Sequence, residues 1–200
     1  MHQTGLCAIV IPPCHFDAPD RLCRTTIMRL RAGLDFMRAH RPWRFFFVLT
    51  GDVSYRPGGV TLAELMGDYL RGHGYSGETV IAHGMTGSFW EPRLVCKTLM
   101  RRKCAEPELR LKHLVVISSD WQLRLGDQFW REATAGTDLQ YHPEAIHGTG
   151  GWRTRLSYGV FTLVVSAART VGLWPRLERY LWKRVYRPRY TRGFQANGCA

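Results

Sequence analysis

Three short apolar runs in the first two thirds of the chain constrain the fold most. They span residues 6–11, 44–50 and 113–118, are rich in Val, Ile and Phe, and place apolar residues at successive rather than alternating positions. Continuous apolarity is typical of strands that are buried on both faces of a parallel sheet. A short run at 79–82 and a weaker one at 137–143 predict two further strands.

Helical signals occupy the intervals between these runs. Apolar stripes or capping residues predict four helices, over residues 25–40, 61–74, 91–103 and 121–133. Thr25 or Thr26 can cap the first helix. Thr61 and Glu64 match a capping box at the start of the second helix, and Pro92 suits the first turn of the third.

The alternation of strands and helices predicts the fold class. Strands about 30 residues apart, with helices between them, form βαβ units with right-handed crossovers. We therefore expect an α/β protein: a Rossmann-like three-layer sandwich with a mostly parallel sheet over residues 1–150. Residues 151–200 are expected to form a basic C-terminal helical extension that is rich in Arg and aromatic residues.

Polar residues follow the predicted strands at their carboxyl ends, where ligands bind in open parallel sheets. Asp52 and Glu91 are the candidate catalytic carboxylates, since each could accept a proton or a hydrogen bond from a ligand hydroxyl or amine. Hydroxyls and backbone amides at a helix start also suit a phosphate or carboxylate. The further candidate ligand-binding residues found this way are Glu64, Ser118, Ser119, Asp120 and Arg124.

Each of these candidates also has a structural explanation. Asp52 suits a turn, and the capping box accounts for Glu64. Ser119 or Asp120 could simply cap the helix that follows, and Arg124 could be a solvated surface residue. Glu91 differs, because Glu is a poor N-cap compared with Ser, Asp or Asn.

Short motifs of polar and small residues follow the predicted strands one after another along the chain. Thr50-Gly51-Asp52 follows the second strand, "SFWEP" with Glu91 precedes the third helix, and Ser118-Ser119-Asp120-Trp121-Gln122 follows the fourth strand. With Glu64, Gly74-Tyr75-Ser76 and Arg29, they cover residues 6–135. In order and spacing, these motifs resemble those of the YdcF/SanA/ElyC-like domain family, as a divergent member.

The resemblance implies a site and a ligand class. It adds Gly51 and the early helical Arg29 to the ligand-binding residues, and it places Gln122 where the family has His. It also implies a nucleotide-like ligand, with S-adenosylmethionine the usual suggestion, and a link to envelope glycan metabolism in bacteria.

The charge of the chain points to anionic partners. There are 28 Lys and Arg residues against 16 Asp and Glu, which gives a net charge of +12. Such a charge favours nucleic acid, an anionic membrane surface or a nucleotide-like ligand. Residues 169–192 concentrate Arg among aromatic residues, and could dock on the domain, lie on an anionic membrane or contact nucleic acid.

The cysteines and apolar segments indicate a cytoplasmic protein. None of the six cysteines lies in a CxxC pair, so we expect mostly buried free thiols and no metal site. A minor alternative is that Cys14, next to His15, is a reactive thiol. Residues 156–168 lack charge over 13 positions, whereas a bilayer span takes about 20. We expect a core or interfacial segment there, and a location that is peripheral at the inner membrane face if the basic extension binds lipid.

Taken together, these features favour a small-molecule enzyme, such as an S-adenosylmethionine-dependent or other group transferase. One alternative is a membrane-surface envelope factor that handles a lipid-linked phosphate sugar. The other is a basic nucleic-acid-binding protein, the partner class that we favour least.

Overall fold

The computed structural model describes residues 5–84 and 87–186. Its strands are β1 (Leu6–Ile11), β2 (Phe16–Ala18), β3 (Arg21–Leu22), β4 (Arg44–Leu49), β5 (Thr79–Ile81), β6 (Leu111–Ser119) and β7 (Gln140–Ile146). Its helices are α1 (Arg24–Ala39), α2 (Leu62–Gly72), α3 (Glu91–Ala105), α4 (Asp120–Thr134), α5 (Trp152–Thr170) and α6 (Trp174–Leu181), followed by a π-helical turn, η1 (Trp182–Tyr186).

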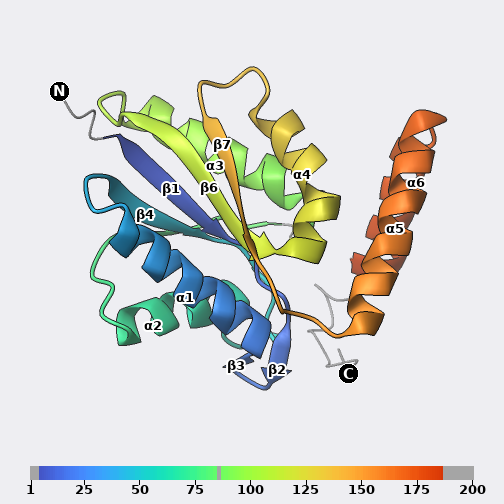
Figure 1. Cartoon of the computed structure of the whole chain (residues 1–200), viewed down its shortest axis with the longest axis horizontal. Helices are drawn as coiled ribbons and strands as arrows, with labels where there is room; N and C mark the ends of the chain where they lie inside the picture. Colours follow the sequence, from blue (N-terminus) through green and yellow to red (C-terminus); the bar gives the residue numbers. More distant parts are fainter. Residues whose placement is uncertain (1–4, 85–86, 187–200) are drawn as a thin grey trace.

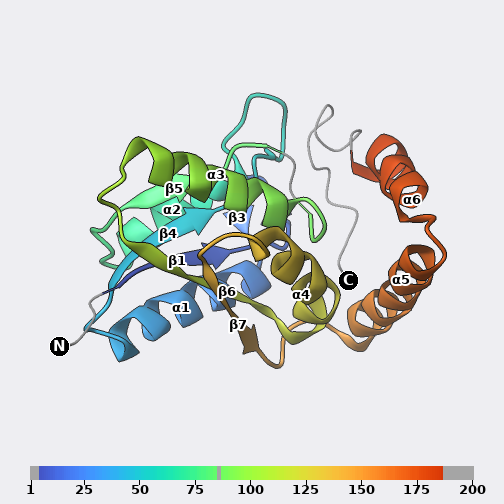
Figure 2. The ribbon, with the colours of Figure 1, turned by 90° about the horizontal axis from the view of Figure 1, so that it is seen from above.

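Five strands form a parallel sheet in the order β5-β4-β1-β6-β7; four of them are labelled in Figure 1 and all five in Figure 2. On the central strand β1, Ile9 and Ile11 pack with residues of α1 and α2, whereas Ala8 and Val10 pack with residues of α3 and α4. Both faces of the sheet are therefore covered by helices. The predicted α/β class and Rossmann-like three-layer sandwich are confirmed, and burial on two faces explains the continuous apolarity of the strands.

Sequence patterns also located most elements correctly. The four predicted helices correspond to α1–α4, and the weak run at 137–143 corresponds to β7. The predicted capping box is present at α2, where Thr61 Oγ1 accepts from the backbone N–H of Glu64, and the Glu64 carboxylate accepts from the backbone N–H of Thr61.

The segment between β1 and α1 differs from the prediction. Residues 16–22 form an antiparallel hairpin, β2–β3, in a region for which no strand was expected. The expected capping of α1 by Thr25 or Thr26 is wrong: Cys23 is the N-cap, and its Sγ accepts from the backbone N–H of Thr26 at 3.4 Å. The Thr26 hydroxyl instead accepts from the backbone N–H of Cys14 at 3.0 Å.

The C-terminal extension packs against the rest of the chain beside α4 (Figure 2). Val165 of α5 and Trp174 and Leu181 of α6 share a buried apolar cluster with Phe89 and Phe129. The end of the predicted basic segment, together with Tyr190 and Cys199, lies outside the described residues. No helix among the described residues combines the length and apolarity that a membrane crossing requires.

Candidate functional site

The strand order creates a divergence at the centre of the sheet. β1 continues through α1 to β4 on one side, while β6 continues through α4 to β7 on the other. β1 and β6 are neighbours, so the chain leaves their carboxyl ends in opposite directions. Such a switch point is where open α/β sheets bind ligands.

A cavity of about 220 Å³ lies at this switch point. Its walls come from the loop after β1, the first turn of α1, the start of α4 and the start of α5. They are formed by Cys14, His15, Asp17, Cys23, Arg24, Thr25, Trp121, Gly150, Gly151 and Thr154. Gly150 has a positive φ of 73°, and a Cβ there would lie 2.8 Å from the Trp121 indole nitrogen, so close packing requires glycine.

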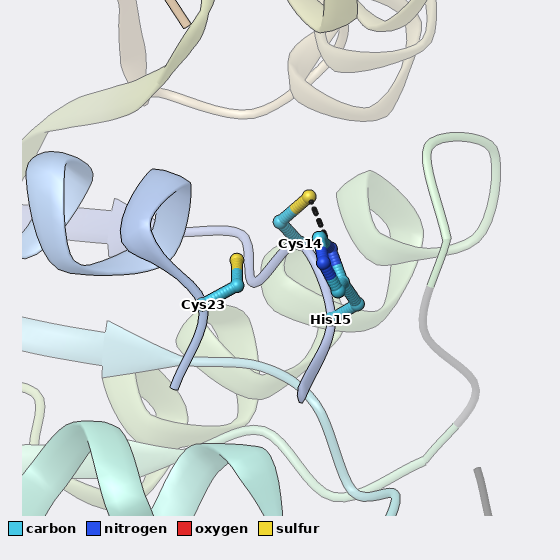
Figure 3. A group of neighbouring side chains, drawn as sticks. All are labelled: Cys14, His15 and Cys23. Atoms are coloured by element: carbon cyan, nitrogen blue, oxygen red, sulfur yellow. Dashed lines mark hydrogen bonds between the residues drawn. The ribbon is translucent and has the colours of Figure 1, made fainter. Parts of the chain in front are cut away.

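Two thiols and an imidazole gather in the cavity wall (Figure 3). The ligating atoms of Cys14, His15 and Cys23 all lie within 4.8 Å of one another, and Cys14 Sγ is 3.0 Å from His15 Nδ1. A hydrogen bond with the Cys14 thiol lowers the pKa of Cys23 to about 3, with further bonds from His15 and Thr26 opposing the effect of burial. The wall therefore carries a thiolate at neutral pH.

Arg29 lies one helical turn behind this wall and is completely buried. Nη1 donates to the carbonyl of Pro12 at 2.6 Å, and Nη2 donates to Ser119 Oγ at 2.9 Å and to Gln122 Oε1 at 2.7 Å. All three acceptors are uncharged. Burial lowers the pKa of Arg29, and the nearby Cys14, Cys23 and Glu91 oppose that effect. The guanidinium is thus a buried positive charge. Nearby groups such as Cys14, Cys23 and Glu91 balance it electrostatically, whereas the atoms that it is hydrogen-bonded to carry no charge.

Glu91 is the first residue of α3 and is 3% exposed. The Thr50 hydroxyl, just after β4, donates to Glu91 Oε1 at 2.8 Å. Burial raises the pKa of Glu91 to about 7, against the opposing effects of Thr50 and Arg29. The N-cap of α3 is Trp90, no side chain caps this helix, and the side chain of Glu91 is buried. It does not line the 220 Å³ cavity.

The residues after β6 face two directions. Ser119 is the N-cap of α4, but its hydroxyl makes no capping bond; it accepts from Arg29 and from the Thr149 hydroxyl at 2.7 Å. Ser118 Oγ is buried without a hydrogen-bond partner among the described residues. Asp120 and Arg124 line a second cavity of about 170 Å³, which shares Trp121 with the first.

Two of the predicted site residues, Gly51 and Glu64, have structural roles, and a third, Asp52, lies apart from both cavities. Gly51 adopts a φ of 109°, and a Cβ there would lie 2.8 Å from Pro13 Cγ and 2.9 Å from Leu62 Cβ. Glu64 is exposed and completes the capping box of α2. Asp52 lies at the end of β4 with its carboxylate 3.4 Å from His83 Nδ1, on a partly exposed surface.

The predicted site is therefore divided. Arg29 and Ser119 are hydrogen-bonded at the switch point, whereas Asp52 lies toward the β4 side, as does Glu91, which is bonded to Thr50 and interacts electrostatically with Arg29. The physical reason is the strand order: β1 stands between β4 and β6, so residues at the ends of those two strands are about 10 Å apart.

Cys23 and Trp121 were not among the residues predicted to form the site, and Cys14 and His15 were expected to have only a minor role. Cys14 and His15 follow β1, so the rule that ligands bind at strand carboxyl ends applied to them as well. Cys23 gave no comparable signal, because its place beside them depends on the β2–β3 hairpin.

Neither the models of known protein families nor the curated proteins contain a match to this chain. The candidate site therefore has to be interpreted from its own geometry.

Proposed function

We propose that this chain is a small-molecule enzyme that binds an anionic, nucleotide-like ligand at the carboxyl ends of β1 and β6. The observation that carries the proposal is the cavity at the switch point, backed by the buried Arg29, whose hydrogen-bond acceptors are uncharged. Among the described residues, Arg29 has no bonded carboxylate, so its charge favours anionic groups nearby; the Cys23 thiolate supplies part of that negative charge, and in this proposal the ligand supplies the rest. Arg24, exposed in the first turn of α1, adds a second cation to the wall.

Ligand size is consistent with this class. Neither cavity alone reaches the roughly 300 Å³ of a typical small-molecule site, but Trp121 lines both. In this proposal the anionic end of the ligand lies in the first cavity and a nucleoside part extends past the indole into the second. S-adenosylmethionine is a cation overall, but it carries a carboxylate beside a nucleoside and would bind here through that carboxylate; group transfer from it needs mainly orientation and desolvation from the protein.

The side chains then have distinct roles. Arg29 and Ser119 are buried behind the wall and line neither cavity, so Arg29 acts on the ligand through its charge, and Arg24, which lines the first cavity, attracts the anion. Glu91, with a pKa near the range suited to proton transfer, lines neither cavity and acts on the ligand through its electrostatic interaction with Arg29.

Charge reversal at the cavity wall tests the proposal. Isothermal titration calorimetry compares the wild type with Arg24→Glu against S-adenosylmethionine, AMP and inorganic phosphate. Arg38→Glu, an exposed arginine in the last turn of the same helix, is the matched control. We expect binding of at least one anion by the wild type and by Arg38→Glu, and its loss in Arg24→Glu. Equal binding by all three proteins contradicts the proposal.

A second function, attachment to an anionic membrane surface, is favoured by the outer face of α5. Trp152, Leu156, Val160, Leu163 and Val164 recur at helical spacing and are all exposed, Trp152 and Leu163 by about 70%. An exposed apolar stripe on a helix that belongs to a strongly basic chain suits the lipid interface. In this role, the enzyme would meet a lipid-linked phosphate sugar at the membrane.

Vesicle flotation tests the second function. The wild type should float with anionic vesicles and not with neutral ones. The double variant Leu156→Ser/Leu163→Ser should remain in the soluble fraction. Val60→Ser changes an exposed apolar residue far along the chain and should float like the wild type. If the double variant floats equally well, the α5 stripe is not the lipid-binding surface.

A further inference from the structure

The β2–β3 hairpin brings three soft ligands together. Cys14 and His15 enter the hairpin and Cys23 leaves it, and the backbone N–H of Cys23 donates to the carbonyl of His15 at 3.3 Å. Phe16 and Leu22 are the next pair of residues in the hairpin after this hydrogen bond, and Phe16 is 1% exposed. Both sides of the group are therefore anchored in the core, and Cys23 is held further as the N-cap of α1.

The separations between the three side chains suit a metal ion. A tetrahedral Zn²⁺ with bonds of about 2.3 Å to sulfur and about 2.0 Å to nitrogen holds two sulfurs about 3.8 Å apart, and a sulfur and a nitrogen about 3.5 Å apart. The ligating atoms here lie within 4.8 Å of one another, and the Cys14–His15 pair is at 3.0 Å. Shifts of about an ångström or less, within the reach of side-chain rotation, complete the coordination.

We propose that Cys14, His15 and Cys23 bind one Zn²⁺, with the fourth coordination position open to the 220 Å³ cavity. Two thiolates and an imidazole select zinc over hard cations such as Mg²⁺ and Ca²⁺. Neither cysteine is held in a disulfide. With Cys14 also deprotonated, the two thiolates balance the charge of the ion, so the complete metal–thiolate group beside the buried Arg29 is neutral.

The position of the group suits reactivity rather than a purely structural role. Structural zinc sites have four protein ligands, whereas catalytic sites have three and keep one position for water or substrate. Here the described part of the chain supplies three ligands, and all three line one cavity. A bound Zn²⁺ would offer a Lewis acid or an activated water to whatever occupies that cavity. The metal inference goes beyond the proposed function and does not depend on the identity of its ligand.

This inference departs from the sequence-based expectation of no metal site. That expectation rested on the absence of CxxC spacing. The eight residues between Cys14 and Cys23 contain the hairpin, which brings the two cysteines together in space as the short spacing of a CxxC pair does in a zinc knuckle.

Metal uptake by the full chain tests the site. The protein is stripped with a chelator, kept reduced with a phosphine, and dialysed against limiting Zn²⁺; bound metal is counted by plasma mass spectrometry. Co²⁺ substitution provides a second measurement, because thiolate-to-cobalt charge-transfer bands report sulfur ligands directly. Cys14→Ser and Cys23→Ser are compared with Cys104→Ser, an exposed cysteine on α3 that lies outside the group.

We expect one Zn²⁺ per chain and cobalt–thiolate bands for the wild type and Cys104→Ser. Cys14→Ser and Cys23→Ser should bind Zn²⁺ at least roughly 10-fold more weakly. Losing a residue that only bonds to a metal ligand already lowers metal affinity about 10-fold or more, and losing a ligand itself should cost at least as much. Circular dichroism checks folding, and serine at position 23 remains a good N-cap. The proposal is overturned if the reduced wild type takes up no zinc, or if both variants bind it as tightly as the wild type. Because no organic ligand is present, either result leaves the calorimetric test of the proposed function unaffected.

Discussion

Replacement of Glu91 by glutamine should remove one pH-dependent component of stability. Burial raises the pKa of this carboxyl from its ordinary 4.5 to about 7. In the unfolded chain Glu91 ionises near pH 4.5, whereas in the folded protein it keeps its proton up to about pH 7. Its contribution to the free energy of unfolding is therefore fully present below pH 4.5 and is lost as the pH rises through 7.

The size of the effect follows from that difference. Each tenfold change in a proton equilibrium is worth about 1.4 kcal/mol, so the loss for Glu91 is about 3 kcal/mol between pH 4.5 and pH 8. Cys23 acts in the opposite direction, because its pKa is lowered from 9.0 to about 3. The diagnostic quantity is therefore the difference between Glu91→Gln and the wild type at each pH, in which the contribution of Cys23 cancels.

Urea unfolding at pH 4.5 and pH 8 measures this difference. In the variant, the new side-chain amide oxygen can still accept from the Thr50 hydroxyl, so the two proteins should have similar stability at pH 4.5. At pH 8 the variant should have gained about 3 kcal/mol relative to the wild type. Glu108→Gln, at an exposed position, is the control for loss of a surface carboxylate. A difference between Glu91→Gln and the wild type that stays the same at both pH values would refute the assignment of Glu91 as a buried, protonated carboxyl.

Three further predictions concern the start of α2, the buried Arg29 and the thiol of Cys23. Thr61→Ala removes the capping box of α2 and should lower the free energy of unfolding by about 1 kcal/mol in urea titrations. Arg29→Met removes three hydrogen bonds to buried acceptors, of which only Ser119 Oγ keeps a second donor among the described residues, and should cost about 3 kcal/mol or more by the same assay; a loss below about 1 kcal/mol contradicts the role given to Arg29. In metal-free protein, iodoacetamide should alkylate Cys23 at a rate that is nearly constant between about pH 5 and pH 8, since its thiolate is already formed. Mass spectrometry of the labelled peptide measures that rate, and a steep increase with pH, as for an ordinary thiol, contradicts the lowered pKa.

Much of the fold could be predicted because its signals are local. Apolar runs marked β1, β4 and β6, and stripes or caps marked α1–α4, all within a few residues. The β2–β3 hairpin gave no such signal, since strands of three and two residues are too short for any periodicity. Cys23 was missed as a cap because serine, threonine, aspartate and asparagine are the residues expected there.

The candidate site was less accessible to sequence reasoning. Residue type and position between a strand and the following helix made Glu91 and Ser119 candidates, but they could not separate these from Glu64, which caps a helix, or from Gly51, which allows close packing. The distinction depends on what each side chain contacts, and Arg29 contacts a residue 90 positions away in the sequence.

The sequence by itself determined that this chain forms a parallel α/β sandwich, because apolar periodicity and helix caps act over a few residues and need no knowledge of neighbours. Only the tertiary structure decided which strand ends meet. The direction in which each crossover leaves the sheet placed β1 between β4 and β6, and that order separated Asp52 from the residues after β6. The same order, together with the hairpin, placed Cys14, His15 and Cys23 at one cavity with Arg29 behind them, a grouping that depends on packing of the whole domain.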